Sequence, residues 1–215
     1  MDVPLGTDTR PTWRGRLHVF ALLVALPMLV ILAIVANGAR AQIGVIVYAI
    51  GLCAMFMASA TYHRWVHTMR ARDLWRRADH AMIFAAIAGS FTPICLLSLP
   101  DRWGIPLLVL MWVGGVFGAA VKFVGWNHAR LAGGVMYAAL STVAALAIPS
   151  LYQRYGVLPA ALMLVSGFFY IVGAIGLNKR WPKLRPSVFS YHEVWHACTV
   201  VAAGAHFGTV WMIVA

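Results

Sequence analysis

Long runs of hydrophobic residues alternate with short polar segments along the whole chain. A helix needs about 20 apolar residues to cross a bilayer core of roughly 30 Å. Seven runs reach that length, over residues 17–36, 43–62, 79–99, 104–124, 131–149, 157–177 and 192–214. Unpaired backbone groups are costly in hydrocarbon, and the runs are continuous rather than alternating, so each run predicts an α-helix. The pattern therefore predicts an all-α bundle of seven transmembrane helices.

The composition agrees with this pattern and indicates a lipid bilayer as the surroundings of the chain. Of its 215 residues, 62% are hydrophobic and only 11% are charged, far from the balance of a soluble domain. The seven runs use nearly the whole sequence, which leaves a short arm over residues 1–16 and one membrane domain over residues 17–215. Three cysteines inside apolar runs are too few for a disulfide framework.

The net charge of +11 comes from basic residues that follow the predicted topology. Fourteen of the 17 lie in the N-terminal arm and in the second, fourth and sixth loops, whereas only Arg40, Arg102 and Arg154 lie in the others. This asymmetry obeys the positive-inside rule, which places the N-terminus in the cytoplasm and the C-terminus outside. The charge excess is thus explained by topology, and we expect no nucleic-acid partner.

Three short stretches concentrate the polar residues that the composition does not explain, at residues 57–65, 77–93 and 190–207. The predicted topology brings all three to the cytoplasmic end of the bundle. Residues four apart share one face of a helix. Ser59 with His63, and His192 with His196, can therefore point inward together.

Three histidines at one depth suggest a metal site. His63, His192 and His196 plus a water match a catalytic zinc site, which has three protein ligands and one open position. Asp79, at the start of the third run, can then act as general base or orient a ligand. The alternative is that Asp79 only pairs with a loop arginine, Arg76 or Arg77.

The other histidines are weaker candidates for this chemistry. We expect His67 to be solvated, and His80 to pack or to lie at the membrane interface. His206 is expected to hydrogen-bond to a neighbouring helix within the membrane. His18 and His128 are also expected at the interface.

The stretch HEVWH, residues 192–196, also matches the H-E-x-x-H signature of zinc proteases. In that chemistry Glu193 is the general base, and a third ligand comes from elsewhere in the chain. Intramembrane proteases of this kind carry an Asp ligand in a later helix, but only FGTVWMIVA, residues 207–215, follows His206. A protease is therefore the weaker interpretation of this stretch.

The polar positions together resemble the hemolysin III family, bacterial members of the progestin and adipoQ receptor group, which is related to the alkaline ceramidases. The resemblance covers nearly the full chain. It is carried by Ser59 and His63 at the end of the second run, by Asp79 ahead of GSFTP at residues 89–93, and by His192 and His196. It implies Zn²⁺ bound by His63, His192 and His196, with Asp79 and Ser59 as catalytic residues. It also implies a multi-pass protein of the bacterial plasma membrane.

Three functions follow as hypotheses. The first is a zinc-dependent, ceramidase-like hydrolase of lipid amides or esters, whose partner is a membrane lipid substrate. The second is a membrane sensor or receptor that binds a lipid ligand and has a structural zinc. The third is a cytolytic pore, which needs polar stripes along several helices, whereas the first, fourth and sixth runs are apolar almost all round. The sequence does not indicate an oligomeric state, since glycine-rich stretches such as residues 114–118 favour contacts inside a bundle.

Overall fold

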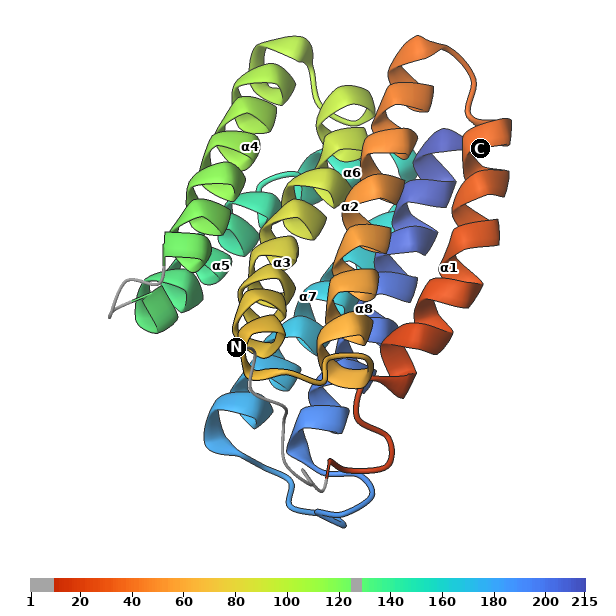
Figure 1. Cartoon of the computed structure of the whole chain (residues 1–215). Helices are drawn as coiled ribbons and strands as arrows, with labels where there is room; N and C mark the ends of the chain where they lie inside the picture. Colours follow the sequence, from red (N-terminus) through yellow and green to blue (C-terminus); the bar gives the residue numbers. More distant parts are fainter. Residues whose placement is uncertain (1–9, 125–128) are drawn as a thin grey trace.

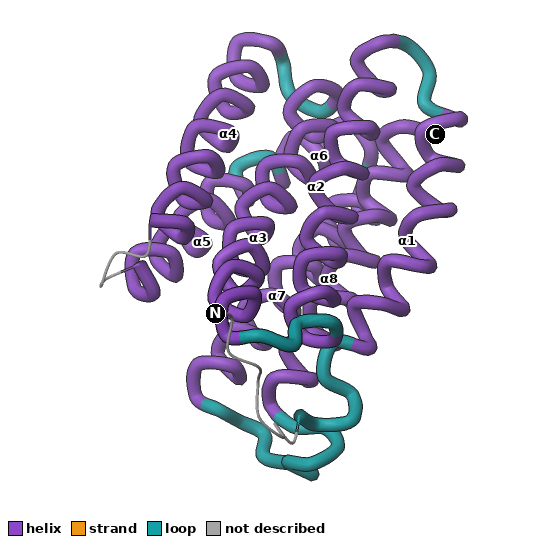
Figure 2. The backbone as a smooth tube through the Cα atoms, viewed as in Figure 1, coloured by secondary structure: helices purple, strands orange, loops and turns teal. Residues whose placement is uncertain are grey.

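The computed structural model describes residues 10–124 and 129–215, in which helices pack side by side along one common direction (Figure 1; Figure 2). The helices are α1 (Arg16–Val35), α2 (Ala39–Arg64), α3 (Met69–Leu97), α4 (Asp101–Val124), α5 (Ala129–Ala145), α6 (Ile148–Tyr155), α7 (Val157–Lys179) and α8 (Tyr191–Val214). Seven segments are long and apolar enough to cross a membrane. The described residues contain no β-strand, and bridge residues such as Arg185 and Phe189 are isolated. The predicted all-α bundle with seven spans is confirmed.

The fifth span is a broken helix rather than a continuous one. Helix α5 ends at Ala145, and α6 starts at Ile148 and reaches Tyr155, six residues beyond the predicted run. Pro149 stands at the second position of α6. Because proline has no backbone N–H, it suits the first turn of a helix and interrupts the preceding one. Together the two pieces form one candidate span, Ala132–Tyr155.

Helix α3 starts at Met69, ten residues before the predicted run. The hydroxyl of Thr68 accepts a hydrogen bond of 3.3 Å from the backbone N–H of Ala71 and so caps this start. Asp73 then pairs with Arg76 and Arg77, three and four residues further on. Such pairs stabilise an exposed helix, but hydropathy does not detect a charged helix. The predicted start at residue 79 was therefore wrong.

Helices α2 and α3 pack closely because glycines face each other across their contact. A Cβ at Gly51 would lie 2.6 Å from the carbonyl oxygen of Ala85, and one at Gly89 would lie 3.0 Å from that of Val47. Small residues let two helix backbones approach in this way. The two helices are antiparallel. Ser59, two turns beyond Gly51 on α2, therefore lies level with Asp79 on α3. The glycine contact thus sets which polar residues meet.

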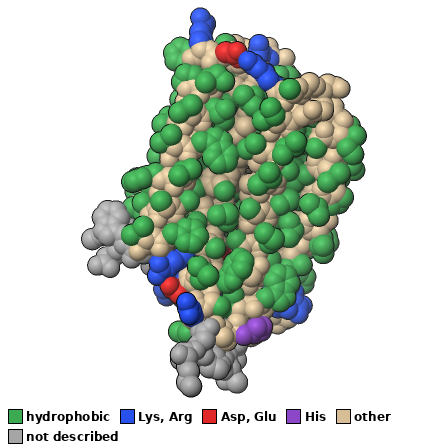
Figure 3. Space-filling model, turned by 45° about the horizontal axis from the view of Figure 1, so that its top comes forward, with side chains coloured by type: hydrophobic (Ala, Val, Ile, Leu, Met, Phe, Trp, Pro, Cys, Tyr) green, Lys and Arg blue, Asp and Glu red, His purple; other side chains and the backbone are tan. Residues whose placement is uncertain are grey.

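Helix α1 packs against both α2 and α8, and α8 also packs against α7. One hydrophobic cluster joins α1, α2 and α8, with Leu29, Leu32, Val45, Tyr48 and Val210 among its buried members. The middle of the molecule presents hydrophobic side chains on its surface, whereas charged side chains gather at the two ends (Figure 3). This is the surface expected of a multi-pass protein in a bilayer.

Candidate metal centre

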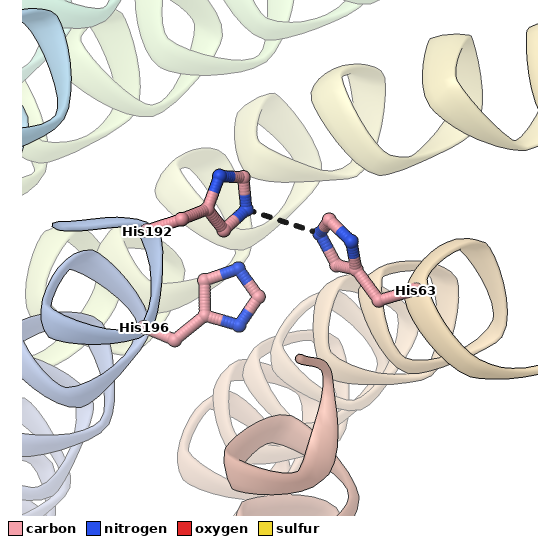
Figure 4. Close-up of side chains that lie close together, drawn as sticks. All are labelled: His63, His192 and His196. Carbon is pink, nitrogen blue, oxygen red and sulfur yellow. Dashed lines mark hydrogen bonds between the residues drawn. The ribbon is translucent and has the colours of Figure 1, made fainter. Parts of the chain in front are cut away.

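Three histidine side chains converge where α2 ends and α8 begins. His63 lies in the last turn of α2, and His192 and His196 lie in the first two turns of α8. One ring nitrogen of each residue lies within 4.8 Å of the other two. Nε2 of His192 and Nε2 of His63 are 3.3 Å apart (Figure 4). The structure therefore brings together the three histidines that the sequence singled out.

This histidine set fits a divalent metal ion. His63 and His196 are only 5% and 3% exposed, and a neutral imidazole carries one donor and one acceptor nitrogen. Several buried nitrogens that face one another are satisfied best by a cation. Two nitrogens on a tetrahedral ion, with bonds of about 2.0–2.1 Å, are about 3.3 Å apart. Nε2 of His63 and Nε2 of His192 have that separation, 3.3 Å, and all three ligand nitrogens lie within 4.8 Å of one another.

Asp79 places a carboxylate beside the three histidines. Its Oδ2 lies 4.0 Å from Nε2 of His63, and its carboxylate shares a side-chain hydrogen bond with Ser59. The two arginines that the sequence offered as partners of Asp79, Arg76 and Arg77, bind Asp73 instead. The side chain of Asp79 is 16% exposed, so it faces the site rather than open solvent.

Glu193, the acidic residue of the H-E-x-x-H match, is 1% exposed and engages both of its oxygens. Its Oε1 accepts a hydrogen bond of 2.5 Å from Nε of Arg14. Its Oε2 accepts one of 2.8 Å from the backbone N–H of Ser190, as part of a capping box that starts α8. This carboxylate holds the helix start and the N-terminal segment, so it is not available as a base.

His18 belongs to the site, contrary to the expectation that it lies at the interface. It is 3% exposed, and its ring stacks on that of His196 with centroids 3.9 Å apart and planes within 6°. Neither ring nitrogen has a hydrogen-bond partner among the described residues. No sequence signal indicates this contact, because the hydrophobic pattern does not show that α1 packs against α8.

The remaining histidines behave largely as expected. His67 is exposed, and Nδ1 of His80 lies 2.7 Å from the carbonyl oxygen of Arg76 on its own helix. Nε2 of His206 lies 3.0 Å from the carbonyl oxygen of Ser90, which links α8 to α3 within the membrane. His128 lies outside the described residues. His67, His80 and His206 do not belong to the cluster at the end of α2.

Comparison with known proteins identifies the family. A family model described as haemolysin-III related matches residues 7–207. The chain belongs to the haemolysin III family. Among its relatives, Hemolysin-3 of Bacillus cereus is 28% identical over 182 residues, which cover 83% of this chain and 80% of the relative. The Hemolysin-3 homolog of Bacillus subtilis (strain 168) is 25% identical over 193 residues, 88% of this chain and 87% of the relative.

A more distant similarity extends beyond bacteria. The monocyte to macrophage differentiation factor of Homo sapiens is 21% identical over 199 residues, 90% of this chain and 80% of the relative. This match supports the predicted relation of the haemolysin III family to the progestin and adipoQ receptor group. The family match over residues 7–207 includes α2, α3 and the first part of α8, which carry the candidate metal centre.

Proposed function

We propose that this haemolysin III family protein is a zinc-dependent hydrolase of lipid amides or esters. The observation that carries the proposal is the convergence of three imidazoles from two helices, within 4.8 Å of one another, beside a carboxylate 4.0 Å from His63. A further part of the proposal is that the site lies near the cytoplasmic face of the bacterial plasma membrane. Its support is the concentration of basic residues in the arm and loops at this end of the bundle.

Zinc suits this ligand set, because three protein ligands with one open position are typical of catalytic zinc sites, including those made of three histidines. His63, His192 and His196 would hold the ion. When bound, zinc would lower the pKa of a coordinated water to about 7 and polarise the carbonyl of a lipid substrate. The position of this site at one end of the bundle favours a substrate whose scissile bond lies close to the lipid headgroups.

Side chains of the protein then transfer the proton. The carboxylate of Asp79 lies where it can accept a proton from the attacking water at Oδ2 and return it to the leaving amine or alcohol. The water oxygen forms a bond to the carbonyl carbon and the C–N or C–O bond breaks, so a fatty acid and an amine or alcohol leave. The hydrogen bond from Ser59 holds the carboxylate in place. No other carboxylate in the described residues lies within an ion-pair distance of this histidine set.

The protease interpretation has less support from the structure. An H-E-x-x-H protease uses its glutamate as the base, whereas Glu193 is bound by Arg14 and by the N–H of Ser190. A cytolytic pore needs a polar pathway along several helices. The polar cluster described here lies at one end of the bundle, and the exposed surfaces of α1, α4 and α7 are rich in large apolar residues.

Metal content and lipid hydrolysis of the detergent-purified protein test the proposal. We expect one zinc per chain in the wild type and release of fatty acid from a ceramide-like substrate. Asp79→Asn keeps the shape of the side chain and removes its basicity, so it should retain zinc and lose turnover by about 100-fold or more. Asp73→Asn, the same change on an exposed part of α3, should retain both zinc and turnover.

The other functions predict different results. In a sensor with a structural zinc, His63→Ala loses metal and thermal stability together, and no variant releases fatty acid. In a pore, liposomes leak their contents, and the leakage is the same for Asp79→Asn as for the wild type. Full turnover by Asp79→Asn would exclude this residue as the base.

A further inference from the structure

The segment before and at the start of α1, residues 10–18, contacts both helices that carry the three histidines. We name these residues the N-terminal clasp. Four of its members, Arg10, Arg14, Gly15 and His18, touch a histidine of the candidate metal centre or its immediate surroundings. The predicted domain arrangement treated most of this segment as an arm outside the bundle. In the structure it forms a wall of the site.

On the α2 side, the clasp binds the end of the helix that carries His63. Nη1 of Arg10 donates a 2.9 Å hydrogen bond to the carbonyl oxygen of His63, and Nη2 donates one of 3.2 Å to that of Val66. Carbonyls in the last turn of a helix have no partner within the helix, and a positive charge is favourable there. Gly15 packs directly on His63, since a Cβ at residue 15 would lie 2.7 Å from the Cβ of His63.

On the α8 side, the clasp binds the start of the helix that carries His192 and His196. Backbone N–H groups of Thr12 and Trp13 donate to the carbonyls of Ser187 and Val188, each at 3.1 Å. Arg14 donates to Glu193, which lies between the two histidines in sequence. The side chain of Arg14 is 23% exposed and that of Glu193 is 1% exposed, so water screens this ion pair only weakly.

This bridging matters because direct packing between α2 and α8 is slight in the described residues, whereas α1 and α3 each pack against both. The link between α3 and α8 includes His206 and Ser90, which lie away from the histidine cluster. The clasp contacts α2 and α8 beside the cluster, so it bears directly on the distance from His63 to His192 and His196. A metal ion bound by ligands from two helices is sensitive to that distance, since its bonds tolerate changes of only about 0.2 Å.

We propose that Arg14, through its ion pair with Glu193, is a positioning residue that aligns α8 with the end of α2 and thereby sets the metal affinity of the histidine centre. The inference rests on the proposed metal site but not on hydrolysis. It assigns the glutamate of the H-E-x-x-H match a role in assembling the centre. The ligands themselves are unchanged in every variant that tests it.

The test uses a double-mutant cycle in the full-length, detergent-purified protein. Glu193→Gln removes the charge but keeps an oxygen for the N–H of Ser190, because glutamine also serves in a capping box. Arg14→Met keeps the length of the side chain and leaves the buried carboxylate without its charged partner. The third variant carries both changes. Arg16→Gln removes a charge from an exposed clasp residue that is not among the four members in contact with the centre, and it is the matched control.

Zinc affinity is measured by competition with a chromophoric chelator, and the geometry of the centre by the absorption bands of bound Co²⁺. Both are recorded where circular dichroism shows every variant to be folded. We expect Arg14→Met to weaken zinc binding roughly 10- to 100-fold, the range for residues that orient metal ligands. The cobalt bands should shift as well. The double variant should recover part of the loss, and Arg16→Gln should match the wild type.

Wild-type zinc affinity and cobalt bands in Arg14→Met would overturn the proposal, even if that variant were less stable. Should Arg14→Met fail to fold, Glu193→Gln decides: weaker zinc binding supports the proposal, and unchanged binding overturns it. A wild-type protein that binds neither metal is a different outcome, because it removes the proposed function together with the centre on which the clasp acts.

Discussion

Asp79 on α3 and Ser59 on α2 share a side-chain hydrogen bond across the closest helix pair of the bundle. Ser59 is 2% exposed, so water does not replace it easily as a partner. The hydroxyl can only orient Asp79, whereas the carboxylate of Asp79 itself exchanges protons in the proposed reaction. The two residues should therefore differ in the size of their effects.

Ser59→Ala should retain zinc and lower turnover by about tenfold, equivalent to about 1.4 kcal/mol, close to the low end for a hydrogen bond to a charged group. Fatty-acid release and metal content are the measurements. Thr142→Val on α5, where the hydroxyl donates to the carbonyl of Ala138 on its own helix, is the control and should leave both unchanged. A loss as large as that of Asp79→Asn would mean that Ser59 takes part in the chemistry directly.

Gly15→Ala should weaken metal binding through its contact with His63. Its φ of +76° is unfavourable for alanine, and the added Cβ would lie 2.7 Å from the Cβ of His63. Gly38→Ala is the matched control, because Gly38 has a φ of +86° and open space around its Cβ. Both variants should lose about 1–2 kcal/mol of stability from the backbone strain. Only Gly15→Ala should lose zinc affinity as well, and equal affinity in the two variants would contradict the contact.

His18→Phe and His18→Ala should have opposite effects on stability. Phenylalanine preserves a ring against His196 and removes two buried nitrogens that have no partner among the described residues. We expect it to raise the melting temperature, since an unsatisfied buried polar group costs about 1–3 kcal/mol. Alanine leaves a cavity and should lower it. Thermal unfolding with and without zinc measures both effects, and a loss of zinc binding in His18→Phe would show that the nitrogens bind something in the site.

Gly51→Ala should separate α2 from α3, because the added Cβ would lie 2.6 Å from the carbonyl oxygen of Ala85. The expected cost is about 1–3 kcal/mol of stability from overpacking. Turnover should fall too, since Ser59 and Asp79 meet across this contact. Gly204→Ala on α8, where nothing lies within 4 Å of the new Cβ, is the control and should be neutral or stabilising. Equal turnover in the two variants would show that the glycine contact does not set the site.

Much of the candidate site could be predicted from spacing and topology. His192 and His196 are four residues apart on one helix, and alternating spans bring His63 and Asp79 to the same end of the bundle. Spacing could not show which residues the arginines of the N-terminal arm contact. Arg10, Arg14 and Arg16 look alike as members of a basic arm, yet the structure places Arg14 on Glu193 and Arg10 on the carbonyl of His63.

The sequence by itself determined the seven spans, because the hydrophobicity and length of each segment decide whether that segment can cross a bilayer. It also identified the three histidines and the carboxylate that could lie together at one end of the bundle. The start of α3 in a charged stretch is also local, since it depends on the Thr68 cap and the pairs of Asp73, but hydropathy does not detect it. Only the tertiary structure decided that Glu193 anchors the N-terminal clasp and that His18 stacks on His196. Such contacts depend on how closely two segments approach each other. Small residues such as Gly15, Gly51 and Gly89 allow a close approach between segments that are far apart in the chain.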